Sequence, residues 1–358
     1  MQNTLKYFHS SFIFTAVVCG LVFFFLGGTA ALLTTILLGV LEVSLSFDNA
    51  VVNATVIKDM DDKWRHRFLT WGMAIAVFGM RLVFPLVIVA VIANINMLDA
   101  LNMALFKPDE YGQTLTSAHL QVAGFGGAFL MMVFWKFFVN EEKDHHWVAI
   151  IEKPLAHIGK IEAVQVALTI ASMFLVTKFL PAEEHLSFWL SGLAGIVTYI
   201  LADGFGALME STEEEVLHPT SGAVQMAKSG FAMFMYLEIL DASFSFDGVI
   251  GAFALTNNIF IIAAGLGIGA MFVRSLTLML VDKGTLEQFA YLEHSAFWAI
   301  GVLATTMFVG TVMHIPEAFV GLSSAAIIAL GVIHSIYAKK NEEADDIAAE
   351  GQATSGSL

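Results

Sequence analysis

Long apolar runs, separated by short polar or Gly/Pro-containing breaks, dominate the hydrophobic pattern of the chain. About 20 apolar residues suffice for a helix to cross a bilayer, where a helix satisfies its own backbone hydrogen bonds. We therefore predict an all-α polytopic membrane protein with about ten transmembrane helices. The predicted helices lie near 11–28, 30–57, 68–95, 117–139, 162–180, 188–209, 229–256, 257–281, 293–313 and 316–337.

The same pattern divides the chain into four parts. Residues 1–28 hold the first membrane helix, and residues 30–180 form the first half of the membrane domain, with a polar cytoplasmic linker at 140–162. Residues 188–337 form the second half. The acidic tail, residues 338–358, has no apolar periodicity and is predicted to be disordered.

Composition supports the membrane assignment and excludes nucleic-acid binding. The chain is 57% hydrophobic and 14% charged, with a mean hydropathy of +0.75, whereas soluble domains are about 25% charged. A net charge of -15 leaves no basic surface to hold nucleic acid. The single cysteine, Cys19, excludes an intrachain disulfide and a cysteine-based metal site.

Positive charges are distributed unevenly between the two sides of the predicted membrane domain. With the N-terminus inside, 13 of the 17 Lys and Arg residues fall in cytoplasmic segments, while Lys107 and Lys178 fall on the opposite side. Arg81 and Arg274 lie within apolar runs. Because cytoplasmic loops are enriched in Lys and Arg, the sequence predicts a protein of the cytoplasmic (inner) membrane with both termini inside.

An internal repeat is the most informative feature of the sequence. Glu42-Val-Ser-Leu-Ser-Phe-Asp48-Asn49-Ala aligns without gaps on Asp241-Ala-Ser-Phe-Ser-Phe-Asp247-Gly248-Val. Further matches pair Gly72 and Arg81 with Gly265 and Arg274, each nine residues apart, and His119 with His294 near helix starts. The two acidic motifs lie five predicted crossings apart, so we expect two inverted-topology repeats, which secondary transporters use to build one midplane site.

The two predicted motif helices contain five acidic residues. Placing each ionised carboxylate inside a bilayer costs at least about 2.5 to 3.5 kcal/mol, so its negative charge needs a compensating partner. A bound cation would supply it. In a regular helix, residues six apart point about 240° apart, so the intervening serines lead us to predict broken second and seventh helices with freed carbonyls. Such hard oxygen ligands suit a divalent cation. The predicted metal ligands are Glu42, Asp48, Asn49, Glu238, Asp241 and Asp247.

Two other interpretations of these acidic residues stay open. The carboxylates can pair with Arg81 and Arg274 as structural contacts between helices, or they can relay protons without a metal. An arginine that pairs with an acid in the empty site and releases it on ion binding is a further hypothesis. Asp203, beside two glycines, is a candidate third pore-lining carboxylate, and His119 and His294 are candidates for a proton-linked role.

The two acidic motifs resemble those of the integral membrane tellurium-resistance family called TerC, which includes manganese exporters. The resemblance covers roughly residues 30–335 and implies a LysE-type transporter fold, Mn²⁺ export and a functional role for the six residues named as ligands. The linker at 140–162 and the Asp203 segment depart from the family pattern and indicate a divergent branch. Because carboxylates repel an anion, direct transport of tellurite is disfavoured.

Together these observations predict a transporter that exports a divalent cation, Mn²⁺ before others, with protons as a candidate counter-ion. No hydrolase, phosphate-binding or cysteine/histidine motif is present, so we expect neither enzymatic activity nor a prosthetic group. The alternative function is a non-transporting membrane scaffold in the response to metal or tellurite stress.

Overall fold

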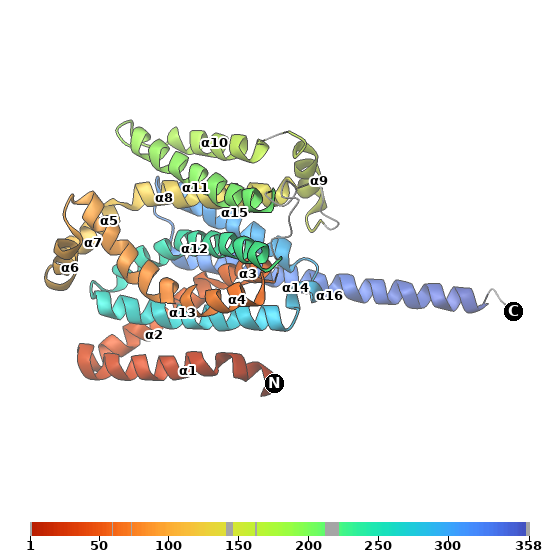
Figure 1. Ribbon diagram of the computed structural model, residues 1–358, viewed down its shortest axis with the longest axis horizontal. Coiled ribbons are helices and arrows are strands. Elements are labelled where there is room, and N and C mark those ends of the chain that lie inside the picture. Colours follow the sequence, from red (N-terminus) through yellow and green to blue (C-terminus); the bar gives the residue numbers. More distant parts are fainter. Residues whose placement is uncertain are drawn as a thin grey trace.

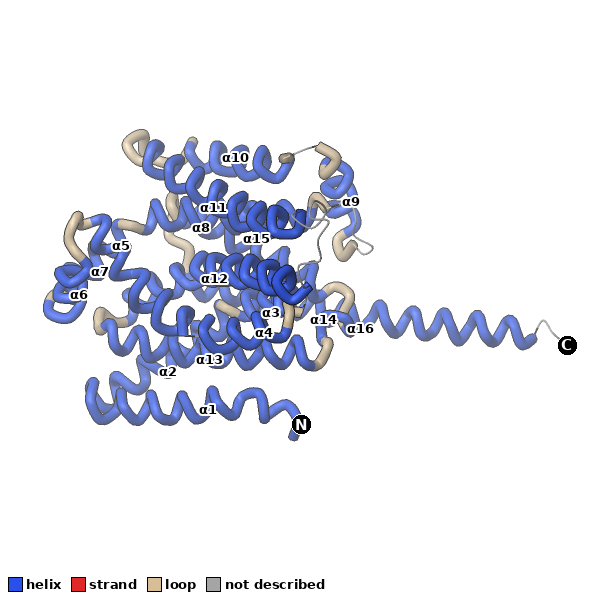
Figure 2. The backbone as a smooth tube through the Cα atoms, in the orientation of Figure 1, coloured by secondary structure: helices blue, strands red, loops and turns tan. Residues whose placement is uncertain are grey.

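The apolar runs fold as helices that pack side by side, most of them along one common direction (Figure 1). The computed structural model describes residues 2–58, 60–72, 74–140, 146–161, 163–211 and 222–355, and within these ranges no strand occurs (Figure 2). The predicted all-α class is therefore confirmed. Both termini lie at one end of the bundle, here called the terminal end, while α6 and α7 lie at the opposite end (Figure 1).

The elements of the first half are α1 (Gln2–Val22), η1 (Phe23–Gly27), α2 (Gly28–Leu45), α3 (Phe47–Ile57), α4 (Asp62–Arg67), η2 (Phe68–Gly72), η3 (Ile75–Val83), α5 (Phe84–Ile92), α6 (Met97–Phe106), α7 (Pro108–Ser117), α8 (His119–Phe138), α9 (Ala149–Ile158) and α10 (Val164–Thr177). Those of the second half are α11 (His185–Ser211), α12 (Gly222–Leu255), α13 (Ile259–Asp282), α14 (Thr285–Gln288), α15 (Leu292–Gly310) and α16 (Glu317–Ser355). The elements η1, η2 and η3 are π-helical.

Seven stretches of the described chain are long and apolar enough to cross a membrane. They are Thr4–Leu45, Ile75–Ile92, His119–Phe138, His185–Gly204, Ile259–Asp282, Leu292–Gly310 and Phe319–Lys340. Their outer faces are apolar; Phe24, for example, is 80% exposed. Such surfaces suit contact with lipid tails, so the helices indicate a bilayer environment.

The first of these stretches contains two of the predicted helices. Gly27 and Gly28 have φ values of 138° and 64°, which residues with a side chain rarely adopt. They separate α1 from α2, and both of these helices pack against α13. The glycine pair therefore turns the chain where the sequence analysis places the boundary between its first two helices.

A break in the second predicted helix is present, but the break expected in the seventh is absent. Ser46 lies between α2 and α3 with φ −101° and ψ 18°, outside helical geometry. By contrast, α12 runs without interruption through Ser243 and Ser245. The Ser243 hydroxyl donates to the carbonyl of Ile239 one turn earlier, at 3.0 Å, so it bonds to its own helix without opening it.

Two predicted polar segments also contain helix. The described part of the linker holds α9, while residues 141–145 and 162 lie outside the described residues. In the tail, α16 continues to Ser355 and projects beyond the bundle (Figure 1), so the expected disorder is not found as far as that residue. Ala, Glu and Lys are strong helix formers, and they are frequent in this segment.

Glycine permits a close helix contact beside the candidate site. A Cβ atom on Gly265 of α13 would lie 2.5 Å from Leu38 Cβ and 2.9 Å from the Thr35 carbonyl oxygen of α2. These distances are below normal contact, and both obstacles sit at or next to the backbone. The approach of α2 to α13, which frames the site described below, therefore requires a residue without a side chain.

Gly265→Ala is expected to destabilise the protein by about 1 to 3 kcal/mol, because overpacking forces the two helices apart. The matched control is Gly20→Ala, since a Cβ atom on Gly20 meets nothing within 4 Å and alanine favours a helix. Unfolding in detergent, followed by circular dichroism against temperature, compares the two variants. Equal stability of both would contradict the close contact.

Candidate functional site

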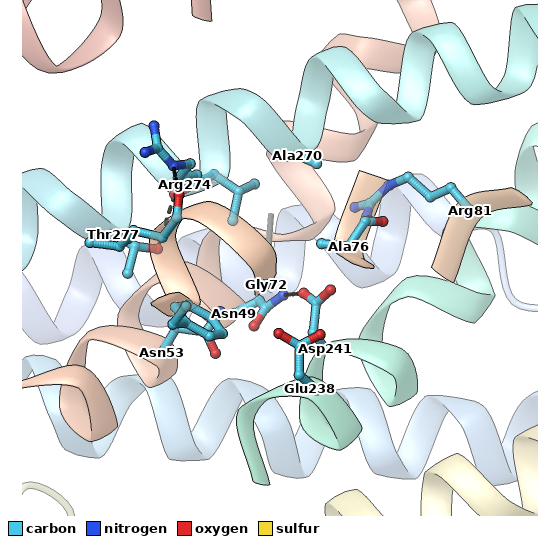
Figure 3. A pocket seen from close by; sticks show the side chains of 13 residues that line it. Asn49, Asn53, Gly72, Ala76, Arg81, Glu238, Asp241, Ala270, Arg274 and Thr277 are labelled. Atoms are coloured by element: carbon cyan, nitrogen blue, oxygen red, sulfur yellow. Dashed lines mark hydrogen bonds between the residues drawn. The ribbon is translucent and has the colours of Figure 1, made fainter. Parts of the chain in front are cut away.

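The two acidic motifs meet at a small, partly open cavity between the helices, here called the inner cavity. It has a volume of about 40 Å³ and lies between α3, η2, η3, α12 and α13 (Figure 3). About 10 to 15 Å³ is enough for one water molecule, so the inner cavity has room for an ion with few waters. Its polar lining residues are Asn49, Asn53, Arg81, Glu238, Asp241, Arg274 and Thr277.

A hydrogen bond joins the two motifs directly. The side-chain amide of Asn49, from the first motif, donates to Oδ1 of Asp241, from the second, at 2.7 Å across 192 residues of sequence. Both side chains are buried, with exposed fractions of 2% and 8%. The structure therefore brings three of the predicted ligands, Asn49, Asp241 and Glu238, to one cavity.

Several oxygen atoms of this lining are buried and have no hydrogen-bond donor. They are Oδ1 of Asn49, Oδ1 of Asn53, both carboxylate oxygens of Glu238 and Oδ2 of Asp241. Buried polar atoms are almost always satisfied, and an exception calls for an explanation such as an ion or water. All five atoms are acceptors, so a bound cation or a hydrogen-bond donor such as water would satisfy them.

Each of the two arginines of the lining has at least one acceptor, although Arg81 Nε is buried without one. Arg81 forms a buried ion pair with Glu42 and also donates to the carbonyl of Ala76 at 2.5 Å. Arg274 Nε donates to the carbonyl of Leu69 at 2.8 Å. Figure 3 shows Arg274 to the upper left and Arg81 to the upper right of the carboxylates. Because five oxygen atoms of the lining lack a donor and only Arg81 Nε lacks an acceptor, the unmet demand of the described lining is mainly for positive charge.

Glycines leave room for the acidic side chains. A Cβ atom on Gly72 would lie 2.6 Å from Glu238 Oε1, and one on Gly248 would lie 2.8 Å from Glu42 Oε2. A Cβ atom on Gly269 would overlap the Glu42 side chain. The repeat pattern pairs Gly72 with Gly265, but their roles differ. Gly72 makes room for the Glu238 side chain at the cavity, whereas Gly265 allows α2 to pack closely against α13.

The other predicted ligands lie outside the inner cavity or outside the described residues. Glu42 contacts Arg81 and lines a second cavity. Asp48 is buried in the first turn of α3, where its Oδ1 accepts from the Asn49 backbone N–H at 2.9 Å. The side chain of Asp247 lies outside the described residues. Among the described side chains, no three His, Cys, Asp or Glu residues come together as a metal site.

Asp203 and His119 occupy different surroundings. Asp203 pairs with Lys136 at 2.5 Å, and the two side chains are 40% and 49% exposed; the inner cavity's described lining does not include it. His119 lines the second cavity, together with Glu42, Asp109 and His314. This cavity, here called the vestibule, has a volume of about 950 Å³.

His294 belongs to a separate polar cluster around Glu152 of α9. Glu152 is buried and accepts 3.0 Å hydrogen bonds from the backbone N–H groups of Trp147 and Val148 and from the indole of Trp298. His294 Nε2 lies 3.6 Å from Glu152 Oε2. The cluster fastens α9 to α15, which is a structural role that the linker pattern did not indicate.

Glu152→Ala is expected to lower the free energy of unfolding by at least about 2 kcal/mol, because it leaves three N–H donors without an acceptor at about 1 to 3 kcal/mol each when buried. Glu152→Gln keeps one acceptor oxygen, so it should lower the free energy of unfolding by less than Glu152→Ala does. Detergent unfolding curves measure both. A loss in Glu152→Ala no larger than in Glu152→Gln would contradict this role.

Asn53 and Thr277 line the inner cavity but were not among the predicted site residues. Asn53 follows Asn49 by four residues, and such positions share one face of a helix. This spacing is the sequence signal that would have found Asn53. No comparable sequence signal indicates Thr277, because its position at the cavity depends on how α13 packs against the other helices.

The fold and the inner cavity together describe a helical membrane protein with a polar site among its helices. Residues 47–342 match the family described as protein of unknown function (DUF475), and the chain belongs to that family. No curated protein and no solved structure matches the chain. The matched segment includes Asn49, Asn53, Glu238 and Asp241 and begins after Glu42.

Proposed function

We propose that this protein is a secondary transporter that exports a divalent cation, Mn²⁺ before others, through the inner cavity and across the cytoplasmic membrane, with protons as counter-ion. The observation that carries the proposal is the set of five buried oxygen atoms without a donor around one small cavity. Ionisable side chains among membrane helices cost free energy, and where they occur they commonly mark an ion or substrate pathway.

The chemistry of the lining favours a divalent ion. Ionised Glu238 and Asp241 together carry two negative charges, and Asn49 and Asn53 add neutral amide oxygens. Hard oxygen ligands of this kind suit Mn²⁺, Mg²⁺ and Ca²⁺ rather than soft metal ions. The resemblance of the two motifs to the TerC family supports Mn²⁺ as the first choice.

Ion flux in vesicles containing the purified protein tests this function. Inside-out proteoliposomes are supplied in turn with Mn²⁺, Ca²⁺ and Mg²⁺, and uptake is followed with and without a proton gradient. Saturable Mn²⁺ uptake above that of empty vesicles is the expected result. If folded protein moves none of the three ions, the proposal fails; proton flux alone would then favour a proton route, and no flux at all would favour a scaffold.

A further inference from the structure

A buried ion pair joins a residue that lines the inner cavity to one that lines the vestibule. Glu42 lines the vestibule and Arg81 lines the inner cavity, and the two side chains are bonded to each other. Both are nearly inaccessible, at 3% exposure for each side chain. The pair therefore stands between the small polar cavity and a much larger one.

The vestibule lies towards the end of the bundle opposite the termini. Its lining includes Asp109 and Gln113 of α7 and the segment 310–315, which connects α15 to α16. Figure 1 places α7 at that end. An ion that passed Glu42 would therefore enter a wide space on the side away from the terminal end.

A second arginine contact also borders the inner cavity. Arg274 lies in the C-terminal half of α13, and its Nε donates to the Leu69 carbonyl of η2. Both residues line the inner cavity, and Figure 3 shows Arg274 to the left and Arg81 to the right above the carboxylates. The repeat pattern pairs these same two arginines, so each half of the chain contributes one arginine contact beside the cavity.

We propose that these contacts are the two barriers of the transport path: Arg81 with Glu42 closes the inner cavity from the vestibule, and Arg274 with Leu69 closes it from the terminal end. This inference rests on the proposed function for its ion, whereas the two contacts themselves are present in the structure. Alternating access requires that the two sides open in turn. A cation in the inner cavity opposes Arg81 electrostatically and attracts Glu42, so occupancy weakens the first barrier.

Thiol accessibility tests the barriers without requiring transport. In a Cys19→Ser background, Ala270→Cys places the thiol in the inner cavity, because Ala270 lines it. The probe is Ag⁺, a single thiol-reactive ion, applied to one face of sealed vesicles, and the thiol left unreacted is counted with a fluorescent maleimide after denaturation. Gln113→Cys, exposed in the vestibule, is the control.

Adding Arg81→Gln is expected to raise the reaction rate of the inner thiol at least tenfold from the vestibule face and leave it unchanged from the terminal face. Arg274→Gln should do the reverse. The Gln113→Cys control should react at one rate from the vestibule face in every background, which shows that access to the vestibule itself is unchanged. Where Arg81→Gln misfolds, the double variant Glu42→Gln/Arg81→Gln opens the same barrier without an unpaired charge.

Inner-thiol rates that do not change, or that rise from both faces with either variant, would overturn the two barriers. These results do not depend on Mn²⁺ flux. If the protein transports no ion but shows the two one-sided increases in thiol reaction rate, the proposed function is contradicted and the two barriers are supported. If it transports Mn²⁺ and the thiol reaction rates do not change, the proposed function is supported and the barriers are contradicted.

Discussion

Asp241→Asn is expected to abolish most cation flux while leaving the protein at least as stable as before. The substitution keeps an oxygen that can accept from the Asn49 amide, so the contact between the motifs survives. It replaces an unpaired acceptor of the inner cavity with a donor and removes a charge. Each 1.4 kcal/mol lost from ion binding is a tenfold weakening, and we expect a decrease of at least about tenfold.

The unchanged or increased stability is the sharper part of this prediction. A buried carboxylate oxygen without a partner costs free energy, and functional sites commonly retain such costs. Glu238→Gln should behave like Asp241→Asn, since neither oxygen of Glu238 has a partner. Asp203→Asn is the control: its carboxylate is 40% exposed, pairs with Lys136, and should be dispensable for flux. If Asp241→Asn lost stability but kept full cation flux, the carboxylates would have a structural role and would not bind the transported ion.

The helical class and the meeting of the two motifs were predictable from the sequence. Apolar run length is a strong signal because a bilayer permits few alternatives to a helix. The repeat led us to expect one shared site, and the hydrogen bond from Asn49 to Asp241 joins the two motifs at the inner cavity. Neither conclusion needed knowledge of how individual helices rotate about their axes.

The division of roles between equivalent positions was not predictable. Glu42 and Asp241 align in the repeat, yet Glu42 pairs with Arg81 while Asp241 faces the inner cavity. Likewise, the serines of the first motif coincide with a break at Ser46, and those of the second do not interrupt α12. A helical pattern gives the positions that share a face, whereas the partner of each side chain depends on packing between distant segments.

Breaking the Glu42–Arg81 pair from one side is expected to be the most destabilising change in the protein. Removing one partner of a buried ion pair costs about 3 to 5 kcal/mol, because the other charge stays buried without compensation. Arg81→Met and Glu42→Gln should each show this loss. The double variant should recover much of it, so that the double-mutant cycle gives a large coupling energy.

The matched control is the pair Lys136 and Asp203, whose side chains are 49% and 40% exposed. Exposed pairs contribute about 0 to 1 kcal/mol, so Lys136→Met and Asp203→Asn should be nearly neutral and additive. Detergent unfolding of the four variants of each pair measures both cycles. A coupling of about 3 kcal/mol for the buried pair corresponds to a roughly hundredfold preference for the closed arrangement. An ion entering the inner cavity can offset that amount, whereas a coupling below about 1 kcal/mol would be too weak to hold the barrier closed.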